Sequence, residues 1–93
     1  MARPAASDDV FRAIADPTRR GIIDLLVQRP HTAGEIAASF ASCQSTVSEH
    51  LAVLRRASIV TYTEQGGRRI YELTPDPLGE VTAWSATWSH ALP

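Results

Sequence analysis

The sequence of 93 residues has one cysteine, no lysine and no long run of apolar residues. A single cysteine cannot form an internal disulfide, which suits a reducing compartment. Without a long apolar run there is neither a signal peptide nor a transmembrane segment, so we expect a cytoplasmic protein with no membrane partner. No repeat or linker divides the chain. With 44% apolar residues it can bury a modest core, and we expect one domain over residues 1–93, with residues 1–6 disordered.

Residue patterns typical of catalysis are also missing. There is no glycine-rich phosphate loop and no set of nucleophile, base and acid. Ser48, Glu49 and His50 are consecutive, and consecutive residues on a helix point about 100° apart, so they cannot converge as a triad. We therefore expect no enzyme activity and no cofactor.

Residues 32–56, TAGEIAASFASCQSTVSEHLAVLRR, are typical of two short helices joined by a tight turn. Thr32 and Glu35 have the spacing of a capping box, in which each side chain accepts the other's backbone N–H. Apolar residues then recur at helical spacing, which predicts a helix over Ala33–Ser39. Residues 41–43 form the turn, and Cys43 stands where a helix-capping serine is usual.

The second helix of this segment combines an apolar stripe with a polar face. Val47, Leu51 and Leu54 lie at i, i+4 and i+7, so they face a core. A helix–turn–helix places the first residues of its second helix against base edges in the major groove of double-stranded DNA. We expect the base-reading residues to be Gln44, Ser45, Thr46, Ser48, Glu49 and His50. The alternative is an ordinary helical hairpin with a solvated polar face.

Two β-prone segments follow the second helix. Residues 59–63 and 70–73 are rich in β-branched and aromatic side chains, and Gly66-Gly67 between them is a hairpin turn signal. A hairpin directly after a helix–turn–helix is a wing. Its arginines, Arg68 and Arg69, are placed to reach phosphates or a minor groove. The predicted fold is mainly α with a small β-hairpin, a winged helix–turn–helix.

The flanking segments predict three further helices. Ser7 or Asp8 can cap a first helix over residues 7–15. Asp16 and Pro17 suit the N-cap and first position of a second helix. This helix is apolar on more than one side at residues 22–27, so we expect it at the centre of the core. After the hairpin, Asp76 can cap a last helix over residues 76–91. The predicted order is three helices, the recognition helix, two strands and a last helix.

The charge distribution matters more than the net charge of −1, which is not the basic balance expected of a DNA-binding protein. All nine positive side chains are arginine, and six come as adjacent pairs. Arginine forks match phosphate oxygens in pairs of hydrogen bonds. We expect contacts to phosphates, or from the wing, by Arg19, Arg20, Arg55, Arg56, Arg68 and Arg69.

Four segments together resemble the ArsR-type winged-helix transcriptional repressors: FRAIADPTRRGIIDLL, TAGEIAASF, QSTVSEHLAVLRRASIV and EQGGRRIYEL. The most specific parts are Ala15–Arg20 and Ser48–Arg55. The resemblance implies a homodimer that binds an imperfect palindrome in a promoter and blocks transcription. It also implies a dimer interface formed by the first and last helices, with Phe11, Ile14, Val81, Trp84 and Trp88 near the two-fold axis. Alternatively, the two tryptophans cover this chain's own core.

The sequence departs from the metal sensors of that family. These resemble one another in a cysteine pair before the recognition helix, and the matching residues 32–36 contain no cysteine. The last helix offers only Asp76, Glu80 and His90, whereas zinc needs three or four converging ligands. We expect the subgroup that lacks the cysteine motif, without a metal site. The sequence does not decide whether His90 contributes to a metal site between subunits, whether there is an inducer, or which operator is bound.

Two alternatives to a plain repressor remain. A thiol at a helix N-terminus has its thiolate form favoured, so Cys43 could make the repressor responsive to oxidation, or it could be a silent cap residue. A winged helix can also serve as a protein-interaction module, but that role requires neither a polar recognition face nor paired arginines. We expect a sequence-specific DNA-binding transcriptional regulator.

Overall fold

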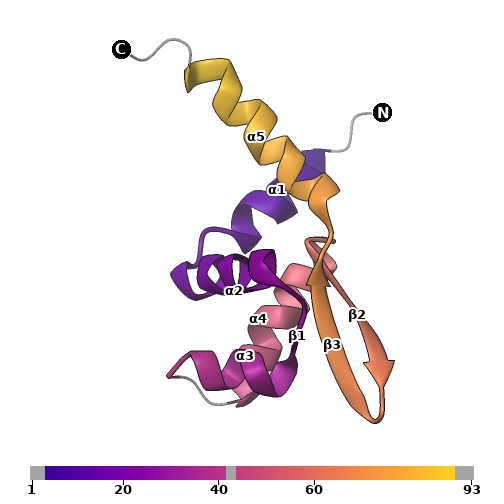
Figure 1. Ribbon diagram of the computed structural model, residues 1–93. Coiled ribbons are helices and arrows are strands. Elements are labelled where there is room, and N and C mark those ends of the chain that lie inside the picture. Colours follow the sequence, from indigo (N-terminus) through magenta and orange to yellow (C-terminus); the bar gives the residue numbers. More distant parts are fainter. Residues whose placement is uncertain (1–3, 42–43, 90–93) are drawn as a thin grey trace.

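The computed structural model describes the backbone of residues 4–41 and 44–89, with side chains except at 4–8, 75–77, 80 and 87–89. The elements in chain order are α1 (Pro4–Ala13), α2 (Pro17–Gln28), β1 (His31–Thr32), α3 (Ala33–Ser39), α4 (Gln44–Arg56), β2 (Val60–Gln65), β3 (Arg68–Leu73) and α5 (Pro75–Ser89). The strands form an antiparallel sheet in the order β1-β3-β2. In Figure 1 the β2–β3 hairpin extends to one side of the helices, and α5 leads away from them beside α1.

Local capping signals place the middle helices where the sequence predicts them. The Asp16 carboxylate accepts the backbone N–H of Arg19 at 3.0 Å, and Pro17 begins α2. The Thr32 hydroxyl accepts the N–H of Glu35 at 3.1 Å, and the Glu35 carboxylate accepts the N–H of Thr32 at 2.9 Å. This capping box satisfies two of the N–H groups that a helix start leaves unpaired. The predicted bounds of α3 and the predicted start of α4 are confirmed.

The outer helices begin earlier than the sequence predicts. Helix α1 starts at Pro4 rather than at Ser7 or Asp8, so part of the segment expected to be disordered is helical. Helix α5 starts at Pro75, which places Asp76 inside the first turn rather than at the cap. Proline is favoured at the first position of a helix because its missing N–H has no intrahelical acceptor there.

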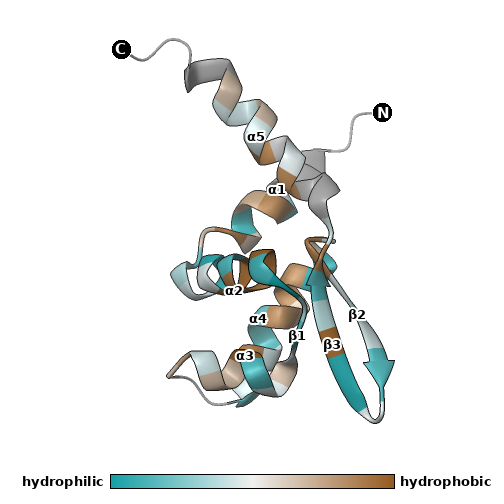
Figure 2. Cartoon of the chain, viewed as in Figure 1, coloured by the Kyte–Doolittle hydropathy of each residue, from teal (hydrophilic) through white to brown (hydrophobic). Residues whose placement is uncertain are grey.

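The core lies where α1, α2, α3 and α4 meet the base of the sheet. Val47, Leu51 and Leu54 are buried along one stripe of α4, as predicted. In α2 only Ile22 and Leu26, one turn apart, are fully buried, and Val27 is 67% exposed. Helix α2 thus contributes one buried face to the core, with Ile23 and Leu25 partly buried against it, while its opposite face meets solvent. Figure 2 shows apolar stretches along the helices and a hydrophilic outer half of the hairpin.

The sheet contains one strand that the sequence pattern did not predict. The two residues of β1 pair with β3, with His31 opposite Tyr71 and Thr32 opposite Ile70. Strands β2 and β3 pair from Val60–Leu73 to Gln65–Arg68. Gly66 and Gly67 turn the hairpin with φ of 59° and 79°, a conformation that glycine adopts without steric cost. No helix in the described parts of the chain is long and apolar enough to cross a membrane.

Candidate nucleic-acid interface

The first two turns of α4 present polar side chains to solvent. Gln44, Ser45, Ser48 and Glu49 are exposed, and Thr46 is half-buried. The buried stripe on the opposite side of the helix holds this face outward. The amide and hydroxyl side chains can both donate and accept hydrogen bonds, and the Glu49 carboxylate can accept them.

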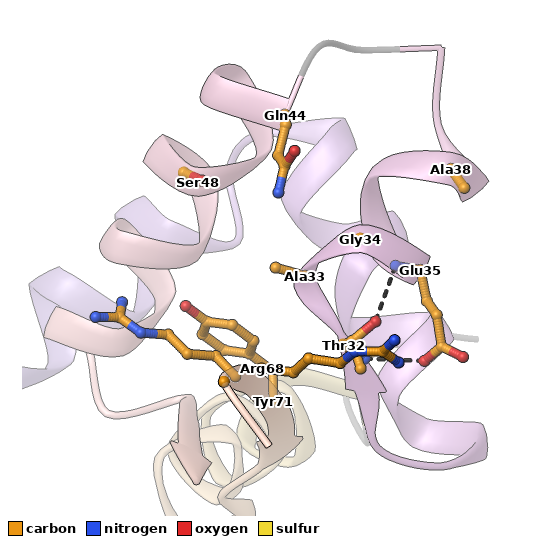
Figure 3. Close-up of a pocket in the computed structure, with 11 residues that line it drawn as sticks. Thr32, Ala33, Gly34, Glu35, Ala38, Gln44, Ser48, Arg68 and Tyr71 are labelled. Carbon is orange, nitrogen blue, oxygen red and sulfur yellow. Dashed lines mark hydrogen bonds between the residues drawn. The ribbon is translucent and has the colours of Figure 1, made fainter. Parts of the chain in front are cut away.

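An open groove of about 730 Å³ separates this face of α4 from the hairpin. In Figure 3, Gln44 and Ser48 lie on α4, Ala33 and Gly34 come from the start of α3, and Arg68 and Tyr71 come from β3. The lining residues are Thr32, Ala33, Gly34, Glu35, Ala38, Gln44, Ser48, Gly67, Arg68, Arg69 and Tyr71. The groove therefore joins the polar start of α4 to the arginine-bearing end of the hairpin.

The hairpin arginines, adjacent in sequence, have different surroundings. The guanidinium carbon of Arg69 lies 4.5 Å from the centre of the Tyr62 ring, and its Nε lies 3.6 Å from the Glu64 carboxylate. A hydrogen bond with Tyr71, with added attraction from Tyr62 and Glu64, raises the pKa of Arg69. Arg68 is exposed, and no described residue forms a hydrogen bond or ion pair with its side chain.

Tyr62 also connects the hairpin to α4. The guanidinium carbon of Arg55, in the last turn of α4, lies 5.0 Å from the centre of the Tyr62 ring. Two cations thus lie within cation–π distance of one aromatic ring. Tyr71, directly opposite on β3, packs against Tyr62 with the ring centres 5.4 Å apart. This cluster holds the hairpin at a defined orientation to α4.

The arginine pair at the start of α2 is engaged by the protein itself. Arg19 Nε and Nη2 donate to the carbonyls of Ala13 and Arg12 at 2.6 and 3.1 Å. Arg20 Nη1 donates to the carbonyls of Ile14 and Ala15 at 2.8 and 3.1 Å. The sequence predicts both as phosphate ligands; in the structure both guanidinium groups lie against the end of α1 and the link that follows it.

His50, expected among the base-reading residues, lies on the flank of α4. Its side chain is only 17% exposed, with Nδ1 3.2 Å from Arg19 Nη1 and 3.9 Å from the Asp16 carboxylate. The backbone N–H of Arg19, with the nearby His50 and Arg19 side chains, lowers the pKa of Asp16. The ring is therefore packed against the start of α2 instead of standing on the exposed face.

Comparison with known proteins decides the family. Residues 16–62 match the family of bacterial regulatory proteins called arsR, which covers half of the chain, including α2, α3, α4 and the start of β2. The chain belongs to the ArsR family. It is also 38% identical to the transcriptional repressor SdpR of Bacillus subtilis over 83% of this chain and 86% of SdpR.

Solved structures agree with this ArsR membership. The crystal structure of the ArsR family transcriptional regulator RHA00566 matches with a TM-score of 0.85 and 29% identity, over 98% of this chain and 95% of that one. The homodimeric winged helix–turn–helix DNA-binding domain of Mb0332 from Mycobacterium bovis matches with a TM-score of 0.75 and 25% identity, over 96% and 88%. This ArsR protein is a DNA-binding transcriptional regulator with a winged helix–turn–helix fold. Helix α4 is its recognition helix, and the β2–β3 hairpin is its wing.

The residues expected at a dimer interface lie on α1, directly after it and on α5. Phe11 contacts Trp84 edge to face, with ring centres 5.4 Å apart and planes at 76°. Ile14 and Val81 are half-buried, whereas Trp84 remains 54% exposed. Part of this apolar surface is thus uncovered in the single chain. The remaining expected member, Trp88, has a side chain outside the described residues.

The other residues predicted to be functional lie away from the groove or outside the described residues. Arg56 is exposed at the far end of α4, where it lines a shallow pocket of about 270 Å³ with Asp9 and Arg12, away from the groove. Cys43 and His90 lie outside the described residues. Among those that are described, no three His, Cys, Asp or Glu side chains come together as a metal site.

Sequence reasoning missed the two tyrosines that connect the wing to α4. Tyr62 and Tyr71 lie opposite each other only because of the hairpin register. A usable signal was present, since each strand carries one tyrosine, and counting outward from Gly66-Gly67 would have paired them. It also missed His31, which is buried, with Nδ1 2.8 Å from the carbonyl of Arg29.

Proposed function

We propose that this ArsR protein represses transcription as a homodimer that binds an imperfect palindrome in a promoter. One observation carries the proposal: one open groove has the exposed polar start of the recognition helix on one side and, on the other, a wing arginine that no described residue binds. Base edges are read by hydrogen bonds in the major groove of DNA, whereas phosphates are negatively charged and attract arginine. The groove supplies both kinds of contact side by side.

Base recognition is assigned to the first two turns of α4. Gln44 can pair with adenine through two hydrogen bonds, and Ser45, Thr46 and Ser48 can bond to any base. Glu49 can accept a hydrogen bond from the cytosine amino group, or repel DNA that lacks one at that position. Gln44 and Ser48 are supported by their place in the lining of the groove, and Ser45 and Glu49 by their exposure on the first two turns of α4.

Phosphate contacts are assigned first to Arg68. It is exposed and has no described intramolecular interaction that must be broken on binding. Arg55 and Arg69 are secondary candidates, because both already lie against the Tyr62 ring. Arg56, at the far end of α4, is a peripheral candidate. Arg20 would have to release two carbonyl groups.

Dimerisation is assigned to α1 and α5. Phe11 and Trp84 form an aromatic pair whose tryptophan is more than half exposed, and aromatic residues are enriched at interfaces. A two-fold dimer places two recognition helices in successive major grooves and matches a palindromic site. The homodimeric state of the Mb0332 domain supports this arrangement, and the repressor SdpR supports the direction of regulation. We place the protein in the cytoplasm, where it meets the promoter, with no enzyme activity.

The test is selection of binding sites from random double-stranded DNA, with affinities then measured at several salt concentrations. We expect two inverted half-sites whose centres are about one helical turn, roughly 10 base pairs, apart, and an affinity that falls steeply with salt. Sedimentation should show a dimer, and a reporter under the selected site should be silenced. Failure to enrich any sequence at low salt would instead favour a protein-interaction module.

Oxidation sensing through Cys43 is tested on the same site. Peroxide treatment that fully oxidises the thiol should leave affinity unchanged if Cys43 is only a cap residue. A loss of affinity that thiol reductant reverses, and that Cys43→Ser abolishes, would establish the redox-responsive repressor.

A further inference from the structure

One guanidinium group joins three helices at the junction of α1, α2 and α4. Arg19 lies in the first turn of α2, where its backbone N–H is bound by Asp16. Its Nε and Nη2 donate to the carbonyls of Ala13 and Arg12, the last residues of α1. Carbonyls at the end of a helix lack an intrahelical partner and form the negative end of its dipole. Arg19 therefore supplies both hydrogen bonds and positive charge to the end of α1.

The remaining arm of the same guanidinium reaches the recognition helix. Nη1 lies 3.2 Å from Nδ1 of His50. A guanidinium can only donate, so this hydrogen bond uses the Nδ1 lone pair, which the tautomer with its proton on Nε2 provides. The imidazole is mostly enclosed, at 17% exposure. A planar group with donors in a fixed fork thus connects the end of α1 to the middle of α4.

This connection differs in kind from the apolar packing around it. Val10 and Ala13 of α1 are fully buried against the core, but apolar contacts are non-directional and tolerate small rotations of one helix against another. Hydrogen bonds weaken steeply when their angles change. The Arg19 fork therefore restricts the orientation of α4 relative to α1 more tightly than the packing alone.

We propose that Arg19 is a positioning residue for DNA binding, which fixes the angle between the recognition helix and the dimer helix α1. The inference rests on the proposed function, in which α1 belongs to the dimer interface. In such a dimer, the angle between α1 and α4 sets the distance and rotation between the two recognition helices. Arg19 thereby determines how strictly the protein requires one separation of half-sites, and it does so without contacting DNA.

The adjacent arginine provides a matched control. Arg20 also donates to two carbonyls in the segment that links α1 to α2. No hydrogen bond or ion pair between Arg20 and α4 accompanies these bonds in the described part of the chain. Arg19→Gln and Arg20→Gln remove the same charge from neighbouring positions, but only the first breaks the connection to His50.

The experiment uses the full chain and three DNA duplexes: the site selected by the wild type, and the same half-sites moved one base pair apart or together. One base pair changes the separation by about 3.4 Å and the rotation by about 35°. The measured quantity is the ratio of Kd on the shifted duplexes to Kd on the selected one. We expect Arg19→Gln to lower this ratio by about tenfold, the size of one hydrogen bond to a charged group. Arg20→Gln should keep the wild-type ratio, whatever its effect on affinity itself.

A second pair of variants approaches the contact from α4. His50→Leu cannot accept the hydrogen bond and should lower the ratio as Arg19→Gln does, whereas His50→Gln supplies an amide oxygen and should restore much of it. The double variant Arg19→Gln/His50→Leu should lose no more than either single variant, because residues that act through one contact are not additive. Thermal unfolding and sedimentation confirm that each variant is folded and dimeric, and the His50 pair decides the matter if Arg19→Gln does not fold.

Two results would overturn the inference in different ways. If Arg19→Gln weakens all three duplexes equally and makes binding less dependent on salt, Arg19 is a phosphate ligand, and the proposed function stands. If the wild type selects no paired half-sites, the proposed function is wrong, and this inference, which rests on it, is wrong as well.

Discussion

Arg68 offers the sharpest test of how the wing contacts DNA. It begins β3 beside the Gly66-Gly67 turn, and the described residues leave its guanidinium free of hydrogen bonds and ion pairs. Replacing it with glutamine should change the free energy of unfolding by no more than about 0.5 kcal/mol, as for most exposed positions. Any effect on DNA binding then reflects the lost charge rather than damage to the fold.

The expected size follows from the release of counterions. Each phosphate contact contributes about 0.9 to the slope of log K against log salt concentration. A dimer carries two copies of Arg68, so Arg68→Gln should make the slope shallower by about 1.8. Between roughly 50 and 200 mM salt, the wild type should lose about 12-fold more affinity than the variant. Fluorescence anisotropy on the selected operator, at four or more salt concentrations, measures the slope directly.

The adjacent residue, Arg69, provides the control variant. Arg69 lies against Tyr62 and beside Glu64, so Arg69→Gln should loosen the wing and weaken binding with a smaller change of slope. An unchanged slope in Arg68→Gln would refute the assignment. So would a loss confined to one base pair of the operator, because a phosphate ligand weakens all sequences together.

Three further predictions concern recognition, packing and acid stability. Gln44→Ala should cost roughly 1–3 kcal/mol of binding and relax base preference at one position per half-site, which repeated site selection would reveal; an unchanged preference would contradict it. Gly21→Ala should destabilise the fold by about 1–3 kcal/mol, because the new Cβ would lie 2.9 Å from Phe40 Cε1; urea unfolding measures this, and a neutral result would mean that the ring moves freely. The hydrogen bond from the Thr32 N–H, with help from Arg29, lowers the pKa of Glu35 below 4.5. The Glu35 carboxylate therefore stabilises the fold above pH 4.5, and this stabilisation is lost as the pH falls through its lowered pKa. The stability of Glu35→Gln should depend less on pH in the acid range, and an unchanged pH profile would exclude the contribution.

Helix boundaries in the middle of the chain were predictable because their signals are local. Asp16 and the pair Thr32 and Glu35 bond to backbone groups three residues away, so sequence spacing already contains the geometry. The spacing of the stripe on α4 likewise determines which face is buried. Strand β1 was not predictable in this way. Its residues pair with β3 about forty positions later, and a two-residue strand is too short to show alternation.

The same distinction between local and distant contacts applies to the candidate site. The polar start of α4 and the Gly66-Gly67 turn follow from residue type and periodicity, and they suffice to indicate a winged DNA-binding domain. The roles of the arginines do not follow from the sequence. Arg68 and Arg69 are identical residues side by side, and only their surroundings in the fold distinguish them.

The sequence by itself determined the family, the element order and the recognition face, because each depends on contacts within a few residues. Only the tertiary structure decided that Arg68 has no partner among the described residues while Arg69 lies on Tyr62, and that Arg19 joins α1 to His50. The physical reason is that a long flexible side chain bonds to whatever groups packing brings within its reach. Those groups belong to elements that are distant along the chain.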